Sequence, residues 1–346
     1  MLNSSLKLNT KIFDKDVEQV PIRKGFGEGL VIAGRMEERV VALCADLTDS
    51  TTMNLFAKEF PKRFVEMGVA EQNLASVASG MSAMGKIPFI SSYAMFSPGR
   101  NWEQIRTTIC YNDRKVVIAG SHAGISVGPD GGTHQAIEDI AITRVIPNLT
   151  VISPCDALEA KKATLAAVTW KTPVYIRLAR EKTAVITTDE TPFEIGKAQI
   201  FYDGSLGHSM SKSCAVGIVA TGALVAKAIL VANALGKEGI AVKVLNLPTI
   251  KPLDEKALVL LAQETGAIVS VEEHQIRGGM GSAVAECLVK HHPVPQEFVG
   301  VDDRFGQSGT PEQLIEYYKM GESAIIFAVK KVLARKLVNK KSKVFA

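Results

Sequence analysis

The sequence is poor in cysteine and in excess charge of either sign, and both shortages exclude classes of protein. Its five cysteines are widely spaced and form no Cys-x-x-Cys pair, which argues against a disulfide framework or a zinc site and for a reducing compartment. A net charge of +4 over 346 residues is too small to indicate a protein that binds nucleic acid. The one dense basic run, at 340–343, is typical of a solvated terminus.

Long hydrophobic runs are also missing. No apolar run approaches the length of a membrane-spanning helix, and the first residues lack the apolar segment of a signal peptide. The composition, 47% hydrophobic and 22% charged, is that of an ordinary globular protein. We therefore expect a soluble cytoplasmic protein that binds neither nucleic acid nor a membrane, and its length favours two domains.

Short β-rich apolar runs alternate with helical patterns along the first half of the chain. We expect strands at 40–46, 115–120, 150–154 and 174–178, and helices at 25–37, 67–84, 102–111 and 156–170. Asp156 is the expected N-cap of the last helix. This alternation is typical of βαβ units with a parallel sheet covered on both faces.

A polar, turn-rich stretch at 181–213 then predicts a linker. The second half repeats the alternation, with strands expected at 215–220, 242–247, 267–272 and 297–300, and helices at 222–236, 254–265, 279–291, 311–319 and 322–337. The sequence thus predicts an α/β protein of two doubly wound domains, at 17–185 and 205–337.

The most informative loop follows the expected strand at 115–120. It reads SHAGISVGPDGGTHQ and contains His122, Asp130 and His134 among four glycines. Glycines let a backbone approach a ligand closely or take positive φ. From the spacing alone, a turn-rich loop with surface histidines remains an equal alternative, whereas the pattern HX₇DX₃H matches no specific metal site.

A carboxylate and a group of aromatic residues precede this loop in the sequence. The stretch 64–84 predicts a helix in which Glu71 shares the apolar face. An acid in a first helical turn is favoured by the helix dipole, but a desolvated carboxylate also needs a hydrogen-bond partner. Tyr93, Phe96 and Trp102 form either part of the core or a stacking surface for a flat ring.

Together these segments resemble the C-terminal half of transketolase, a thiamine-diphosphate enzyme. The resemblance runs from about residue 18 to residue 336, and its motifs are RFVEMGVAEQN, SSYAMF, GSHAGISVGPDGGTHQ, PVYIRLARE, VSVEEHQIRGGMGSAVAE and GVDDRFGQSGTPEQL. Related forms occur in deoxyxylulose-phosphate synthase and in the β subunit of 2-oxoacid dehydrogenases. The resemblance implies a parallel-sheet pyrimidine-binding domain and a smaller C-terminal domain that mainly builds the assembly.

The resemblance implies a cofactor site. Glu71 would hydrogen-bond N1′ of the aminopyrimidine and favour the imino tautomer, whose nitrogen removes the proton from C2 of the thiazolium. Tyr93 and Phe96 would hold the pyrimidine, and Asp46 would lie near the cofactor at a subunit contact. One residue is inserted near 97–99, so the family's third aromatic contact has no clear counterpart, and Trp102 is one candidate for it.

The resemblance also implies a substrate site. Asp130 would contact substrate hydroxyls and select their configuration, and His134 would bond hydroxyls near the carbonyl and help proton transfer. The sugar phosphate would be met by Arg23, Ser50, His122 and Arg180. Arginine suits this task because its guanidinium donates two parallel bonds to phosphate.

The family's diphosphate-binding half carries a Gly-Asp-Gly motif, and this sequence has none. The resemblance therefore implies one chain of a split enzyme, in which an N-terminal transketolase subunit supplies the diphosphate site and Mg²⁺ or Ca²⁺. Because the family builds its site between chains, we expect a dimer of heterodimers and little activity from this chain alone.

The leading hypothesis is the C-terminal subunit of a two-chain transketolase, which transfers a two-carbon ketol unit from a ketose phosphate to an aldose phosphate. The phosphate-binding set favours it over a 2-oxoacid dehydrogenase β subunit, whose substrates carry no phosphate. A biosynthetic transketolase-like enzyme with another donor or acceptor remains open. Glu71, Asp130 and His134 argue against a non-enzymatic scaffold, which would not need them.

Overall fold

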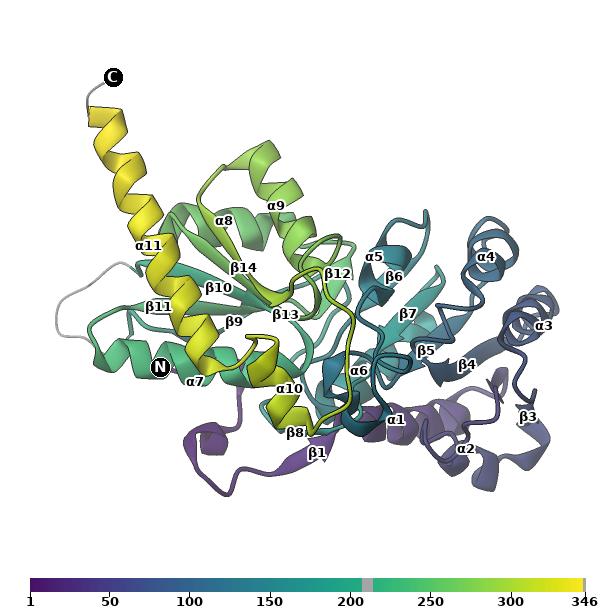
Figure 1. The fold of residues 1–346 in the computed structure, drawn as a ribbon. Coiled ribbons are helices and arrows are strands. Elements are labelled where there is room, and N and C mark those ends of the chain that lie inside the picture. The colour runs from purple at the N-terminus through teal and green to yellow at the C-terminus, as the bar shows by residue number, and fades with distance from the viewer. Residues whose placement is uncertain (207–213, 345–346) are drawn as a thin grey trace.

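The computed structural model describes residues 1–206 and 214–344 (Figure 1). The strands of the first half are β1 (Gln19–Pro21), β2 (Val40–Cys44), β3 (Phe64–Glu66), β4 (Ile87–Tyr93), β5 (Val117–Ser121), β6 (Thr150–Ile152), β7 (Val174–Arg177) and β8 (Lys182–Ala184). Its α-helices are α1 (Ile22–Met36), α2 (Asn54–Glu59), α3 (Glu71–Ala83), α4 (Trp102–Gln104), α5 (Asp139–Arg144) and α6 (Ala157–Thr169).

The second half has the same kind of alternation. Its strands are β9 (Gln199–Asp203), β10 (Val216–Ala220), β11 (Val242–Asn246), β12 (Thr249–Lys251), β13 (Ile268–Gln275) and β14 (Gln296–Val301). Its α-helices are α7 (Val225–Lys237), α8 (Glu255–Thr265), α9 (Met280–His291), α10 (Pro311–Tyr317) and α11 (Glu322–Val344).

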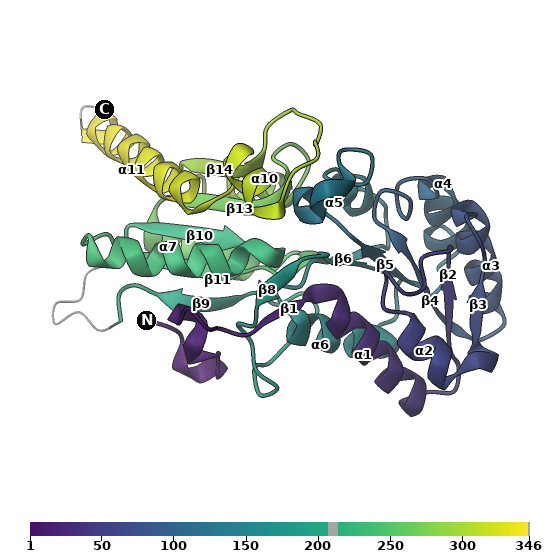
Figure 2. The same ribbon diagram turned by 60° about the horizontal axis from the view of Figure 1, so that its bottom comes forward.

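Two large sheets lie side by side (Figure 2). The first has the strand order β12-β6-β7-β5-β4-β2-β3, and every pair in it is parallel except β12–β6. The second has the order β14-β13-β10-β11-β9, and every pair is parallel except β11–β9. The predicted α/β class with parallel-dominated sheets is confirmed.

Each face of the first sheet buries its own set of side chains. In β2, Val40 and Ala42 pack with α1, α2 and α6, whereas Val41 and Leu43 pack with α3 on the opposite face, as the period of two in a strand requires. The second of these clusters continues into α8 and α9 of the second half. This hydrophobic cluster therefore joins the two halves, which meet through buried side chains rather than only at their surfaces.

Two segments cross between the halves. β12, from the second half, adds an antiparallel edge strand to the first sheet through pairing of Thr249 with Ile152. The first residues of the chain run along the second sheet, where the backbone N–H of Asn3 donates to the carbonyl of Phe201 at 2.9 Å. These crossings mean that neither half is built from one continuous stretch of the sequence.

Several sequence predictions of local structure were wrong. The helix expected at 67–84 begins only at Glu71, because 64–66 form strand β3, an edge strand of the first sheet. The expected linker at 181–213 contains β8 and β9, although residues 207–213 lie outside the described part. The strand β4 was not expected, yet it lies near the centre of the first sheet. The predicted N-cap is confirmed, since Asp156 accepts the N–H of Glu159 at 2.8 Å.

A buried ion pair ties α5 to the first sheet. The Arg177 Nε atom donates to Asp139 Oδ2 at 2.8 Å, and Tyr175 donates its hydroxyl to the same oxygen at 2.7 Å. The side chains of Arg177 and Asp139 are 6% and 1% exposed. Removing one member of such a pair leaves the other charge buried, away from water and without its partner.

We therefore expect Asp139→Ala to destabilise the protein by about 3–5 kcal/mol. The measurement is the urea midpoint, followed by far-UV circular dichroism. Asp189→Ala is the matched control, because the Asp189 side chain is 83% exposed beside Lys161 and such surface pairs contribute about 0–1 kcal/mol. Equal midpoints for the two variants would contradict this account of the ion pair.

Candidate active site

The candidate site lies where adjacent parallel strands of the first sheet end. β4 and β5 are neighbours, with Tyr93 at the end of β4 paired with Ser121 at the end of β5. β7 lies on the other side of β5, and its carboxyl end leads into Arg180. Because the carboxyl ends of parallel strands meet at one edge, side chains that follow them gather there.

Aromatic and histidine rings form the centre of this cluster. The Tyr93 ring stacks on the His122 ring, with centroids 3.8 Å apart and planes 22° apart. The His134 ring meets Phe96 edge-on, with centroids 5.4 Å apart. Trp102 is not part of the cluster, because it packs in the core and donates its indole N–H to the carbonyl of Ile142.

The hydrogen bonds of His122 define its tautomer. Arg23 Nη1 lies 2.9 Å from His122 Nε2, and a guanidinium can only donate, so Nε2 accepts. The proton is therefore on Nδ1, which lies 2.9 Å from the Ser121 hydroxyl. Burial, followed by the positive charges of Arg23 and Arg180, lowers the pKa of His122 to about 3. The ring is thus neutral at physiological pH.

Two arginines give the site its positive charge. Arg23 also donates to the backbone carbonyl of Ser50 at 2.8 Å, and burial together with the charge of Arg180 lowers its pKa. Arg180 donates to the carbonyl of Val127 at 2.6 Å and lies 4.0 Å from Asp130. The repulsion between the two guanidinium groups would be relieved by an anion bound near them.

Glu71 connects to the same cluster through an arginine that the sequence did not point to. Its carboxylate is 2% exposed and accepts a bond from Arg100 Nη1 at 2.9 Å, while the Arg100 side chain is half exposed. The Arg100 guanidinium lies over the Phe96 ring, 5.0 Å from its centroid. The Glu71 backbone carbonyl also accepts a bond from the buried Asn101 at 3.0 Å. The Glu71 carboxylate is therefore buried, and Arg100, its one polar partner among the described residues, links it to the Phe96 ring.

Asp46 lies apart from the cluster. Its residue is exposed, its φ is +55°, and its backbone N–H donates to Glu66 at 2.7 Å. In residues 1–206 and 214–344, no hydrogen bond or ion pair involves the Asp46 carboxylate, and no group of three His, Cys, Asp or Glu side chains could hold a metal ion. The structure thus brings together the predicted site residues of the first domain except Asp46.

Comparison with known proteins identifies the family. Residues 18–185 match the transketolase pyrimidine-binding domain, and residues 208–325 match the transketolase C-terminal domain. The chain belongs to the transketolase family, and this membership implies dependence on thiamine diphosphate.

Relatives of similar length carry consistent descriptions. A transketolase C-terminal section of Methanocaldococcus jannaschii is 42% identical, over 87% of this chain and 93% of its own. A 6-deoxy-6-sulfo-D-fructose transketolase subunit of a Clostridium species is 37% identical, over 94% of this chain and 98% of its own. The solved structure of a split-gene transketolase, an inactive β4 tetramer, is 42% identical, with a TM-score of 0.83 over 92% of this chain and 99% of its own.

The described residues contain no helix long and apolar enough to cross a membrane.

Proposed function

We propose that this chain is the C-terminal subunit of a two-chain, thiamine-diphosphate-dependent transketolase. It transfers a two-carbon ketol unit from a ketose phosphate to an aldose phosphate in the cytoplasm. Residues 17–185 form its pyrimidine-binding domain and residues 205–337 its C-terminal domain. The observation that carries the proposal is the cluster of the Tyr93 and Phe96 rings with arginines, to which Arg100 joins buried Glu71.

The residues present fit the pyrimidine ring of the cofactor. Tyr93 and Phe96 have nearly parallel rings, 14° apart, with centroids separated by 6.1 Å. Arg100 links Glu71 to the Phe96 ring, and because the Arg100 side chain is half exposed, it can turn into solvent at modest cost. When bound, thiamine diphosphate supplies the carbon nucleophile and the electron sink. Glu71 would bond a ring nitrogen, and burial would strengthen that bond.

The remaining residues fit a phosphorylated sugar. Arg23 and Arg180, with Ser50 and neutral His122, would bind its phosphate. Asp130 and His134, which lie in the loop after β5, would bind its hydroxyls, and His134 would move a proton near the reacting carbonyl. The hydroxyl of Thr133 lies 2.9 Å from His134 Nδ1, whereas Nε2 has no hydrogen-bond partner among the described residues and would face the substrate.

The diphosphate and its Mg²⁺ or Ca²⁺ would be held by an N-terminal transketolase subunit. This sequence lacks a Gly-Asp-Gly motif, and its relatives include proteins described as a section, a subunit and the product of a split gene. We propose a dimer of heterodimers in which exposed Asp46 lies close to the cofactor at a subunit contact. The related β4 tetramer is inactive, which fits a chain that needs its partner.

A sulfonated sugar is the second candidate substrate. The relative from Clostridium is named for 6-deoxy-6-sulfo-D-fructose. A sulfonate, like a phosphate, is a tetrahedral oxyanion that arginines bind through charge-assisted hydrogen bonds. Rates measured side by side with fructose 6-phosphate and its 6-sulfo analogue would separate the two.

Removal of the Arg180 guanidinium tests the phosphate site. We expect Arg180→Met to raise KM for a phosphorylated acceptor roughly ten- to hundredfold, because a hydrogen bond to a charged group contributes about 1.5–3 kcal/mol. Arg180→Lys is the matched control, since it keeps the charge and should recover part of the loss. The acceptor without its phosphate should bind both variants and the wild type alike. An equal loss for both acceptors would instead assign Arg180 to the support of the loop at Val127.

A further inference from the structure

The loop that carries the proposed substrate residues is fixed from the second domain. We call residues 122–135 the glycine loop. Glu273, in β13, is 3% exposed and accepts the backbone N–H of Ser126 at 2.6 Å. This bond joins two chain segments that are 147 residues apart in the sequence. Through Ser126, near the start of the loop, the glycine loop is thus hydrogen-bonded to the second domain.

The glycines of the loop make room for the second domain. A Cβ atom on Gly124, where φ is +94°, would lie 2.3 Å from Glu273 Oε1. A Cβ on Gly131 would lie 2.7 Å from the Ser308 hydroxyl, and one on Gly132 would lie 2.7 Å from the Gly306 carbonyl. At such distances a larger residue would require the neighbouring side chain, or at Gly132 the backbone, to shift. The glycines therefore allow close contact with the second domain along the length of the loop.

Gln135 adds a second tie at the end of the loop. Its side chain is almost fully buried, and its Nε2 lies within 3.0–3.3 Å of the carbonyls of Ile125, Gly128 and Gln307. Two of these carbonyls belong to the loop itself, and the third belongs to the second domain. One amide thus closes the loop on itself and joins it to the segment after β14.

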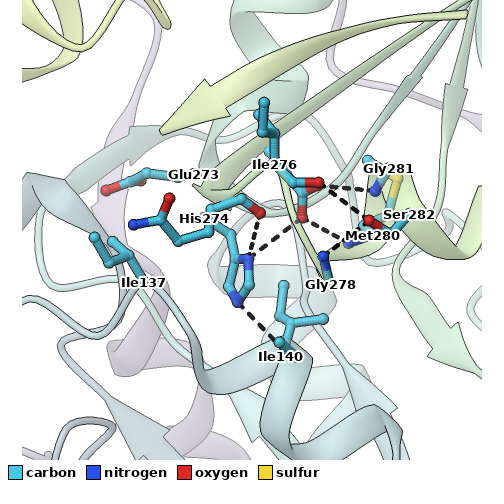
Figure 3. Close-up of polar contacts among 12 residues, drawn as sticks. Ile137, Ile140, Glu273, His274, Ile276, Gly278, Met280, Gly281 and Ser282 are labelled. Carbon is cyan, nitrogen blue, oxygen red and sulfur yellow. Dashed lines mark hydrogen bonds and ion pairs between the residues drawn. The ribbon is translucent and has the colours of Figure 1, made fainter. Parts of the chain in front are cut away.

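The end of β13, which carries Glu273, makes hydrogen bonds with both domains. The neighbouring His274 bonds to both domains, because its Nε2 accepts the backbone N–H of Ala141 at 3.4 Å and its Nδ1 lies 2.7 Å from the carbonyl of Gln275. Arg177 donates to the backbone carbonyl of Glu273 at 2.8 Å. The Glu273 side chain extends away from the start of α9, where Gly281 and Ser282 lie (Figure 3). Glu273 is therefore a fixed anchor rather than a mobile surface group.

We propose that Glu273, supported by Gln135, is a positioning residue for ketol transfer. Its carboxylate holds the backbone of the glycine loop, and through that backbone it sets the places of Asp130 and His134 relative to the Tyr93 and Phe96 rings. The inference rests on the proposed function for the reaction that is affected. The anchoring of the loop can be observed without any reaction.

The test compares Glu273→Ala with Glu273→Gln in the full chain. The alanine variant lacks an acceptor for the Ser126 N–H, whereas the glutamine amide oxygen can replace the carboxylate. We expect Glu273→Ala to speed hydrogen–deuterium exchange at least tenfold in peptides that cover the glycine loop, but not in α6. With the partner subunit, kcat/KM for the ketose phosphate should fall at least tenfold. Glu273→Gln should stay within threefold of the wild type, and all variants should bind thiamine diphosphate with unchanged Kd.

Two further variants keep the test decisive if Glu273→Ala fails to fold. Gln135→Met keeps the side-chain volume but removes the donor, and should have the same two effects. Gln307→Ala is the matched control, because its carbonyl, not its exposed side chain, accepts the bond from Gln135.

The outcomes separate the anchoring from the proposed function. Unchanged exchange in both Glu273→Ala and Gln135→Met, or faster exchange with unchanged kcat/KM, would overturn the positioning role. A Gln variant as impaired as the Ala variant would also overturn it, since the bond to Ser126 would then not be what matters. If the wild type transfers no ketol unit while Glu273→Ala still releases the loop, the proposed function fails and the anchoring stands.

Discussion

Glu71→Ala is expected to reduce ketol transfer by the assembled enzyme roughly 10²–10⁴-fold, the range of a positioned acid–base group. The carboxylate is buried and is linked to the Phe96 ring through Arg100, and a hydrogen bond from a cofactor ring nitrogen would be strong in that water-poor setting. Its loss should cost little stability, because Arg100, the one charged partner of Glu71 in the described part of the chain, is half exposed and can turn to solvent.

Two controls separate chemistry from folding in this experiment. Glu71→Gln keeps the shape but not the charge, so it should be nearly as inactive as the alanine variant. Glu103→Ala removes an exposed carboxylate three residues from Arg100 and should leave the rate unchanged. Steady-state rates at saturating thiamine diphosphate, with thermal melting for each variant, provide the comparison. A Glu71→Ala enzyme that keeps more than a tenth of the wild-type rate would remove Glu71 from the proposed chemistry.

The regular elements of the fold could be predicted where local pattern and tertiary structure agree. The strand pattern at 174–178 became β7, and the helical pattern at 156–170 became α6, because apolar periodicity and a capping aspartate act over a few residues. β12 could not be found in this way. It has three residues, and its partner β6 lies about a hundred residues earlier in the chain.

The strand β4, which ends at Tyr93 in the candidate site, could not be predicted from the sequence pattern. Its residues IPFISSY include a proline and two serines, which are unusual in a central strand. Both Ser91 and Ser92 are buried, and Ser91 donates its hydroxyl to the carbonyl of Ala119 at 2.9 Å. The neighbouring strands thus make up for the weak local preference. Missing β4 also hid the reason why Tyr93 lies beside His122.

The resemblance named the residues of the candidate site, but the sequence did not show the contacts between them. Motif resemblance pointed to Glu71, but Arg100 lies 29 residues further on and nothing in its sequence context marks it as the partner. The glycines of the loop at 122–135 were interpreted as room for a ligand. Three of them do take positive φ, and the structure adds that the second domain fills the space beside them. Such contacts between distant segments leave no local pattern.

The dependence on a partner chain is the other large effect that we expect. In our proposal this chain binds the pyrimidine ring and the sugar phosphate, whereas the diphosphate and the metal ion are bound by the N-terminal subunit. A cofactor held by its pyrimidine alone would lose the charged contacts that normally bind it most tightly. The chain alone should therefore have no measurable ketol transfer, even at high cofactor concentration.

The most direct test measures ketol transfer from xylulose 5-phosphate to ribose 5-phosphate with thiamine diphosphate and Mg²⁺. The chain is assayed alone and after mixing with a transketolase N-terminal subunit from the same genome. We predict activity only in the mixture, rising to a plateau at equal amounts of the two chains. Full activity of the isolated chain would contradict the central claim that it is one half of a split enzyme.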